Sequence, residues 1–277
     1  MKLSLAYSPC PNDTFAFHAL VHNLIDTEGV TFSVELADVE QLNKRAATGQ
    51  YDICKLSYST FFSICDKYVM LRSGSALGYN NGPLFVSLDP DIRRENYPYL
   101  KIAIPGEGTT GALLLKTAFP ECRKLTPVLF SDIESKLINR EFDAGVLIHE
   151  GRFTYQEKGL HLIEDLGSYW QNTTGLPIPL GGIAVSRNLN SGLQNKINRI
   201  LKRSIEFAFA NPERSAEYVS ENAQEMDPEV QKKHIGLFVN TYSLDIGEIG
   251  VSAVSELYKK AMELNPKIIR QDNLFIL

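Results

Sequence analysis

Residues 77–83 read Leu-Gly-Tyr-Asn-Asn-Gly-Pro, and residues 176–182 read Leu-Pro-Ile-Pro-Leu-Gly-Gly. Glycine, proline and asparagine are the residues that most often interrupt helices and strands, so both stretches are expected to connect folded units. The first is followed by the apolar run 84–88, and the second comes before a long helical pattern. We therefore predict that the chain crosses between two lobes near residues 74–95 and returns near residues 176–182.

The segments on either side of the first crossing alternate between strand-like and helix-like patterns. Such alternation is typical of α/β proteins with mostly parallel strands. Before this crossing, we predict strands at 3–7, 31–35, 51–55 and 69–73, and helices at 14–24, 39–48 and 59–65. Between the crossings, we predict strands at 101–105, 127–130, 144–148 and 161–165, and helices at 111–118 and 132–139.

The chain after the second crossing has a helical pattern. Apolar residues recur there at intervals of three and four positions, as at Ile197, Ile200, Leu201, Ile205 and Ala208. Further helices are predicted at 212–222, 228–241 and 248–264. If they return to the first lobe, the α/β chain forms a two-lobed clamshell, with a large lobe of residues 1–92 and 176–277 and a small lobe of residues 93–175. This arrangement resembles the type II periplasmic-binding-protein-like fold, in which a ligand lies in the cleft between the lobes.

The composition excludes several classes of protein. The 277 residues contain 28 Lys and Arg against 33 Asp and Glu, so the net charge of −5 gives no overall attraction for nucleic acid or an anionic membrane. No apolar stretch reaches the roughly 20 residues of a membrane span or the roughly 7 to 15 of a secretory signal. Four widely spaced cysteines favour a reducing cytoplasm, and the histidine pair His18 and His22 lacks the HExxH pattern, so no metal site is predicted. The oligomeric state stays open.

Two candidate binding segments lie in the first lobe, residues 8–14 (Ser-Pro-Cys-Pro-Asn-Asp-Thr) and 55–59 (Lys-Leu-Ser-Tyr-Ser). Both follow predicted strands, and ligands of open α/β sheets bind beyond the carboxyl ends of the strands. Ser8, Asn12 and Asp13 either contact a ligand or form a rigid, capped loop. Lys55 with the hydroxyl of Ser57 at a helix start suits a carboxylate, although a surface lysine beside an ordinary N-cap gives the same pattern.

Two further candidates lie in the second lobe. Residues 105–111, Pro-Gly-Glu-Gly-Thr-Thr-Gly, place the hydroxyls and amides of Thr109 and Thr110 where an anion would bind, but lack the patterns of nucleotide-binding loops. The apolar run that begins at residue 145 ends in His149, a side chain suited to accept a proton near neutral pH. A structural histidine is the alternative, and Glu150 and Arg152 either orient the ring or the substrate, or form an ion pair.

Three motifs carry a resemblance to a known family. Residues 8–15 (Ser-Pro-Cys-Pro-Asn-Asp-Thr-Phe), the Gly-Thr-Thr segment 108–110 and residues 145–155 (Gly-Val-Leu-Ile-His-Glu-Gly-Arg-Phe-Thr-Tyr) resemble the 1,4-dihydroxy-6-naphthoate synthases, lyases of the futalosine route to menaquinone. The resemblance runs over nearly the whole chain. It implies that His149 is the proton acceptor and that the substrate-binding residues are Lys55, Leu56, Ser57, Thr109 and Thr110. Roles for Ser8, Asn12, Asp13 and Asn80 are inferred from position alone.

The resemblance also implies the reaction. Cyclic dehypoxanthinyl futalosine, a small carboxylate, would be cleaved to 1,4-dihydroxy-6-naphthoate and dihydroxyacetone, and no cofactor is expected because the electrons are rearranged within the substrate. Two alternatives stay open: chorismate dehydratase, a sister enzyme of the pathway with the same clamshell, and a non-catalytic cytoplasmic carboxylate-binding protein. The fold alone does not choose between them. The single tryptophan, Trp170, is expected to pack at the second crossing rather than line the cleft.

Overall fold

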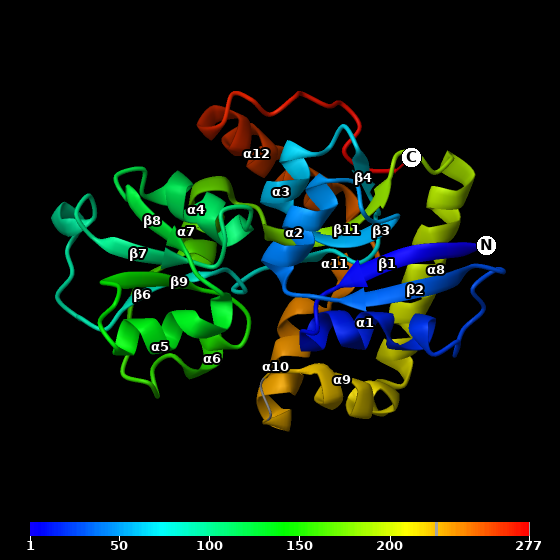
Figure 1. Ribbon diagram of the computed structural model, residues 1–277, viewed down its shortest axis with the longest axis horizontal. Helices are drawn as coiled ribbons and strands as arrows, with labels where there is room; N and C mark the ends of the chain where they lie inside the picture. Colours follow the sequence, from blue (N-terminus) through cyan, green and yellow to red (C-terminus); the bar gives the residue numbers. More distant parts are fainter. Residues whose placement is uncertain (225–226, 277) are drawn as a thin grey trace.

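The computed structural model describes residues 1–224 and 227–276, which form two lobes built around separate β-sheets. The lobes lie side by side in Figure 1, with the first sheet on the right and the second on the left. The first sheet has the order β2-β1-β3-β11-β4, and β5 also pairs with β11. Its strands are β1 (Lys2–Tyr7), β2 (Thr31–Leu36), β3 (Ile53–Ser57), β4 (Tyr68–Met70), β5 (Ala76–Gly78) and β11 (Ile178–Ser186).

The second sheet has the order β10-β6-β9-β7-β8. Its strands are β6 (Leu84–Ser87), β7 (Lys101–Ile104), β8 (Lys124–Pro127), β9 (Ala144–Leu147) and β10 (His161–Asp165). The first crossing therefore lies between β5 and β6, within the predicted range. The predicted lobe limit at residue 92 differs from this pairing, because β6 is hydrogen-bonded to β9 and β10 and so belongs to the second sheet.

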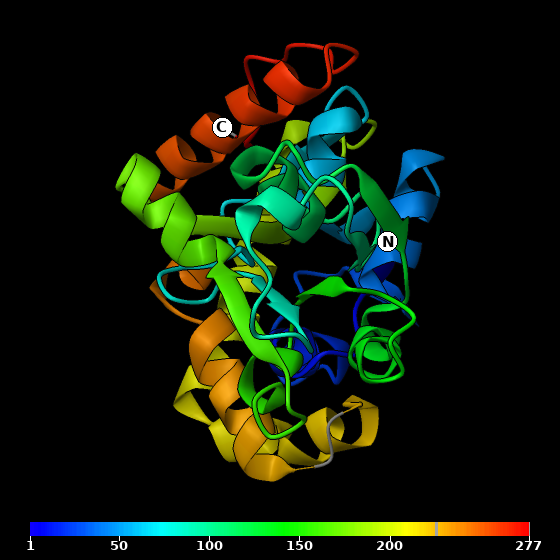
Figure 2. The ribbon, with the colours of Figure 1, turned by 90° about the vertical axis from the view of Figure 1, so that its left-hand side faces the viewer.

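The helices pack around the two sheets. With the first sheet lie α1 (Pro11–Val21), α2 (Val39–Ala47), α3 (Tyr58–Ser63), α8 (Ser191–Ala210), α9 (Ala216–Asn222), α10 (Pro228–Phe238), α11 (Thr241–Leu244) and α12 (Gly247–Leu264). With the second lie α4 (Thr110–Ala118), α5 (Ile133–Ile138), α6 (Gly151–Thr154) and α7 (Leu166–Thr174). Figure 2 shows α12 and α10 at opposite ends of the molecule. No helix within the described ranges is long and apolar enough to cross a membrane.

The alternation of side chains along the strands gives the first sheet two apolar faces. Leu5 and Ile53 belong to a core that includes Ile200 of α8, whereas Ala6 and Leu56 belong to a second core. That second core contains residues of both lobes, and α12 contacts both α3 and α4. Because parallel β1 and β3 run in the same direction, the loops that follow them meet at one edge of the sheet, facing the second lobe.

The second crossing differs from the prediction. Residues 178–182 were expected to form a connection, but they begin β11, which pairs antiparallel with β3, β4 and β5. The sheet is therefore mixed rather than mostly parallel. Glycine explains the close approach of these strands, since a Cβ at Gly181 would lie 2.6 Å from the carbonyl oxygen of Leu56. The strand predicted at 127–130 was also misplaced: β8 ends at Pro127 and residues 130–132 form a 3-10 turn.

Candidate active site

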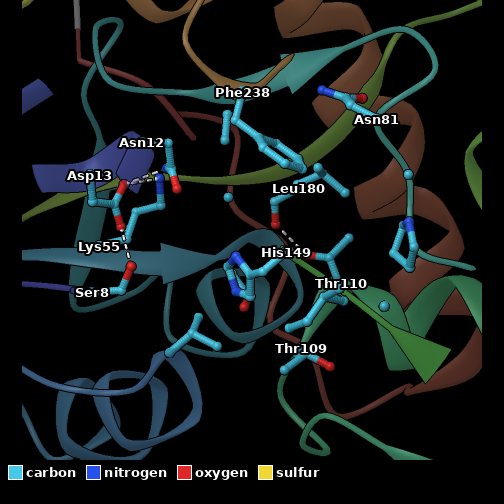
Figure 3. A pocket seen from close by; sticks show the side chains of 18 of the residues that line it. Ser8, Asn12, Asp13, Lys55, Asn81, Thr109, Thr110, His149, Leu180 and Phe238 are labelled. Atoms are coloured by element: carbon cyan, nitrogen blue, oxygen red, sulfur yellow. Dashed lines mark hydrogen bonds and ion pairs between the residues drawn. The ribbon is translucent and has the colours of Figure 1, made fainter. Parts of the chain in front are cut away.

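A cavity of about 730 Å³, its open mouth included, lies between the lobes and is drawn in Figure 3. Its lining combines the segments that follow β1 and β9 with the end of β3, the start of α4 and residues of β11 and α10. The structure brings nine of the predicted site residues to this one cavity: Ser8, Asn12, Asp13, Lys55, Leu56, Ser57, Thr109, Thr110 and His149. Their position is thereby established, while their roles in binding and catalysis stay predictions.

Asp13 is the centre of a buried polar network. Its Oδ1 accepts hydrogen bonds from Lys55 Nζ at 2.9 Å and from Asn12 Nδ2 at 2.8 Å, and its Oδ2 accepts one from Ser8 Oγ at 2.7 Å. The Asp13 and Lys55 side chains are only 5% and 9% exposed. The ammonium of Lys55 is therefore already paired with Asp13 inside the protein, while Lys55 still lines the cavity, and its role in binding a ligand carboxylate stays a prediction.

The start of α4 offers a binding site for an anion, which we call the anion seat. Thr109 caps this helix: its Oγ1 accepts from Ala112 N at 3.3 Å and donates to Gly106 O at 2.8 Å. The amides of Thr110 and Gly111, at the first two positions of the helix, have no acceptor within it and carry the positive end of its dipole. The hydroxyl of Thr110 is not available in the same way, because it donates to Leu180 O at 2.6 Å.

Ser57 lies beside this seat in the other lobe. Asn43 holds it in place, since Asn43 Oδ1 accepts from Ser57 N and Asn43 Nδ2 donates to Ser57 Oγ, both at 3.1 Å. The Ser57 hydroxyl can still donate its own proton to a ligand. Helix α3, which follows Ser57, has only six residues and contributes little dipole of its own.

His149 follows β9 and turns into the cavity. Its backbone has φ +57°, the left-handed region that few non-glycine residues adopt. The ring is partly buried, packs 4.9 Å from the ring of Phe130 and makes no hydrogen bond with the described part of the chain. Burial, and to a lesser extent the charge of Lys55, lower its pKa to about 4 against an opposing effect of Asp13. The imidazole is therefore neutral at pH 7, the form that can accept a proton.

His234 of α10 stacks behind His149. The two ring centroids are 5.8 Å apart and the planes differ by 9°. His234 Nε2 lies 2.8 Å from Asn12 Oδ1, and because the Asn12 amide nitrogen donates to Asp13, this oxygen accepts and Nε2 carries the proton. Its Nδ1 then faces Glu150 Oε1 at 3.6 Å. Burial first, then His149 and Lys55, hold the pKa of His234 well below its ordinary value.

The structure shows where several residues lie whose roles the sequence did not decide. Glu150 Oε1 lies 3.6 Å from His234 Nδ1, and Arg152 donates to Gly82 O at 2.5 Å and to Asp165 Oδ2 at 2.7 Å. Trp170 packs in the core, as predicted, and the structure adds a hydrogen bond from its indole N–H to Pro177 O at 3.0 Å. Asn80 is exposed, whereas its neighbour Asn81 lines the cavity. Sequence reasoning missed Asn81, Leu180, His234 and Phe238.

The cavity has polar ends and an apolar wall. Val39, Ile148, Leu180 and Phe238 supply apolar surface, and the start of α4 supplies donors for an anion. Sites of this kind hold small molecules that combine an apolar ring with a few polar groups. A neutral imidazole on the wall adds a group that can move a proton.

Solved structures with the same arrangement define the class to which this fold belongs. A protein from Archaeoglobus fulgidus superimposes with a TM-score of 0.90 at 32% identity, covering 96% of this chain and 98% of that one. A Candida albicans protein described as having the generic periplasmic binding protein fold superimposes with a TM-score of 0.70 at 14% identity, covering 99% and 93%. The predicted periplasmic-binding-protein-like clamshell is thus confirmed.

Sequence relatives identify the family within this class. The profile of the menaquinone biosynthesis family matches residues 3–263. The 1,4-dihydroxy-6-naphthoate synthase of Thermus thermophilus is 41% identical over 94% of this chain and 93% of its own, and that of Streptomyces coelicolor is 39% identical over 94% and 92%. The chain belongs to the menaquinone biosynthesis family and groups there with the 1,4-dihydroxy-6-naphthoate synthases. The resemblance seen in the sequence is confirmed, and the chain is an enzyme of the lyase class.

Proposed function

We propose that this lyase cleaves cyclic dehypoxanthinyl futalosine to 1,4-dihydroxy-6-naphthoate and dihydroxyacetone, with His149 as the proton acceptor. The observation that carries the proposal is a neutral imidazole in the same cavity as a helix start suited to a carboxylate. The apolar wall between them suits the flat ring system of such a substrate. We place the reaction in the cytoplasm, which agrees with four cysteines that are all free thiols.

The substrate carboxylate would lie at the start of α4. There it would accept hydrogen bonds from the amides of Thr110 and Gly111 and from the hydroxyl of Ser57. These donors come from both lobes, so the carboxylate helps to hold the lobes together. Because the chain has a net charge of −5, its overall charge does not attract an anion. The substrate carboxylate would therefore be recognised by these local donors.

The chemistry would begin when His149 removes a proton from the substrate. The resulting electron pair opens an elimination or retro-aldol sequence in which the carbon–carbon bond to the three-carbon fragment breaks. Formation of the second aromatic ring favours release of that fragment, which takes up a proton as it leaves. The negative charge of Asp13 raises the pKa of His149, so this carboxylate would stabilise the imidazolium while it holds the proton.

Contacts between the lobes would shield the reaction from water. Thr60 Oγ1 of the first lobe donates to Gly108 O at 2.9 Å, and Thr110 Oγ1 of the second donates to Leu180 O at 2.6 Å. Closed cavities strengthen electrostatic interactions and protect reactive intermediates. These contacts border the anion seat, so closure and binding of the carboxylate would occur together.

The proposal is tested by offering the purified protein cyclic dehypoxanthinyl futalosine and chorismate in separate reactions, with products analysed by mass. We expect equal amounts of 1,4-dihydroxy-6-naphthoate and dihydroxyacetone from the first and no product from the second. Dehydration of chorismate would instead identify a chorismate dehydratase. Saturable binding of either compound without any product would identify a non-catalytic carboxylate-binding protein.

Removing the Ser57 hydroxyl should weaken substrate binding. For Ser57→Ala we expect KM to rise about 10-fold or more, because hydrogen bonds to a charged group contribute about 1.5 to 3 kcal/mol. Steady-state kinetics measures this effect, and kcat should change little. Ser63→Ala is the matched control, since Ser63 is exposed at the end of the same helix α3 and lies outside the cavity. Equal KM values for the two variants would place the carboxylate elsewhere.

A further inference from the structure

Asn81 is a buried amide without a partner. Its side chain is 1% exposed, and neither Oδ1 nor Nδ2 has a hydrogen-bond partner within residues 1–224 and 227–276. Buried polar atoms in folded proteins almost always have partners, so such an orphan amide requires an explanation. Asn81 lines the cavity that also contains His149. A ligand in this cavity is therefore a candidate partner for the amide.

The backbone around Asn81 holds the amide in place. The next residue, Gly82, lies against Gly167, where a Cβ on Gly82 would come within 2.3 Å of the Gly167 Cα. The carbonyl oxygen of Gly82 also accepts the 2.5 Å hydrogen bond from Arg152. On the other side, a Cβ on Gly78 would lie 2.9 Å from Asn81 Nδ2. Close packing at Gly82 and the hydrogen bond from Arg152 therefore fix the backbone next to Asn81, and the buried amide stays at the cavity wall.

The position of Asn81 separates it from the anion seat. In Figure 3, Asn81 lies at the upper right of the pocket and Thr109 at the bottom, with Leu180 and Thr110 between them and His149 to their left. An amide offers two N–H donors and a carbonyl acceptor, so it recognises a hydroxyl or a carbonyl with a neighbouring hydroxyl rather than a bare carboxylate. A substrate whose carboxylate lies at α4 would reach Asn81 with its opposite end.

We propose that Asn81 binds the oxygen atoms of the hydroxylated three-carbon part of the substrate, the part released as dihydroxyacetone. This inference rests on the proposed function, and it adds a specificity residue to the site. The carboxylate end and the hydroxylated end would then be held by different lobe segments, the start of α4 and the crossing between β5 and β6. The bond that breaks would lie between them, beside His149.

The test compares two ligands that differ in the three-carbon part. For Asn81→Leu, which has a similar volume, kcat/KM for cyclic dehypoxanthinyl futalosine should fall about 10- to 100-fold, as expected for the loss of one or two hydrogen bonds. The Kd of 1,4-dihydroxy-6-naphthoate, which lacks that part, should stay within about twofold of the unmodified value. The urea midpoint should not fall, because the replaced amide has no partner in the protein. Asn81→Ala should show the same selective loss.

Asn172→Leu is the matched control, because Asn172 is exposed on α7 and lies outside the cavity. If Asn81→Leu and Asn81→Ala keep the kcat/KM of this control, the inference is wrong. Equal losses for both ligands together with a lower urea midpoint would show a structural role and would also overturn it. Absence of turnover by the unmodified protein would overturn the proposed function and this inference together, whereas unchanged variants of an active enzyme would overturn only the inference.

Discussion

The variant His149→Asn is expected to fold and to bind substrate, but to lose turnover by about 10² to 10⁴ in kcat, the usual cost of removing a positioned general base. The reason is that no other described group near the ring is free to replace His149 as the general base. Asp13 accepts hydrogen bonds from Lys55, Asn12 and Ser8, and no second free imidazole faces the cavity within residues 1–224 and 227–276. Single-turnover and steady-state measurements separate the loss of chemistry from any loss of binding.

Asparagine is chosen because the backbone of His149 has φ +57°. Asparagine adopts the left-handed region more readily than most residues, so the strand end and the loop should keep their shape. His161→Asn is the matched control, since His161 is exposed at the start of β10 in the same lobe. Turnover by His149→Asn close to that of His161→Asn would contradict the assignment of His149 as proton acceptor.

The pH dependence provides a second readout for the same residue. The pKa of His149 is lowered to about 4 in the folded protein. As pH falls, the imidazole therefore takes up a proton at a higher pH in the unfolded chain than in the folded one. Its contribution to stability is thus present above the unfolded pKa of about 6.5 and is lost as pH falls toward 4. Stability of His149→Asn, measured by urea unfolding between pH 7.5 and 4.5, should therefore fall less steeply with decreasing pH. The kcat/KM of the unmodified enzyme should fall only as pH approaches 4.

The order of elements could be predicted from the sequence because apolar periodicity separates strands from helices. The strand β11 could not, since residues 176–182 contain two prolines and two glycines, which argue against a strand. In the structure the register of β11 against β5 shifts between Pro179 and Gly181, and Gly181 permits the close approach to Leu56. The prolines and glycines of this segment are tolerated in β11 because of its pairing with β3, β4 and β5. Such pairing is a tertiary contact and cannot be read from the local sequence pattern.

In the site, too, residues marked by a local pattern could be predicted, whereas those set by contacts between distant segments could not. His149 and Asp13 could be predicted because they follow strands, and the loops at the carboxyl ends of parallel strands meet. His234 could not, since it pairs with Asn12 from 222 residues away along the chain. Nor does the pair Asn80 and Asn81 show which amide points inward, because that depends on the φ of +58° at Asn80. Lys55 and Asp13 were both predicted as site residues, but the sequence did not show that they pair, because they belong to different segments.

The buried pair of Lys55 and Asp13 gives the largest expected effect on stability. Lys55→Met should lower the free energy of unfolding by about 3 to 5 kcal/mol, because it leaves the Asp13 carboxylate buried without a counter-ion. Ser8 and Asn12 still donate to that carboxylate, but neither brings a positive charge. Urea unfolding at pH 7.5 measures the loss. Lys44→Met is the control: Lys44 forms a 3.8 Å pair with Glu40 but is 73% exposed, so its loss should cost no more than about 1 kcal/mol.

Combining Lys55→Met with Asp13→Asn should recover much of the lost stability. Asparagine keeps an oxygen that can accept from Ser8, and it removes the unpaired charge that makes the single variant unstable. The double variant should therefore be more stable than the sum of the two single changes, which a double-mutant cycle measures as a coupling energy. If the two changes add and Lys55→Met costs no more than Lys44→Met, the buried pair does not hold the loop after β1 against β3. In that case the ammonium of Lys55 would be free to meet the substrate, as the sequence alone suggests.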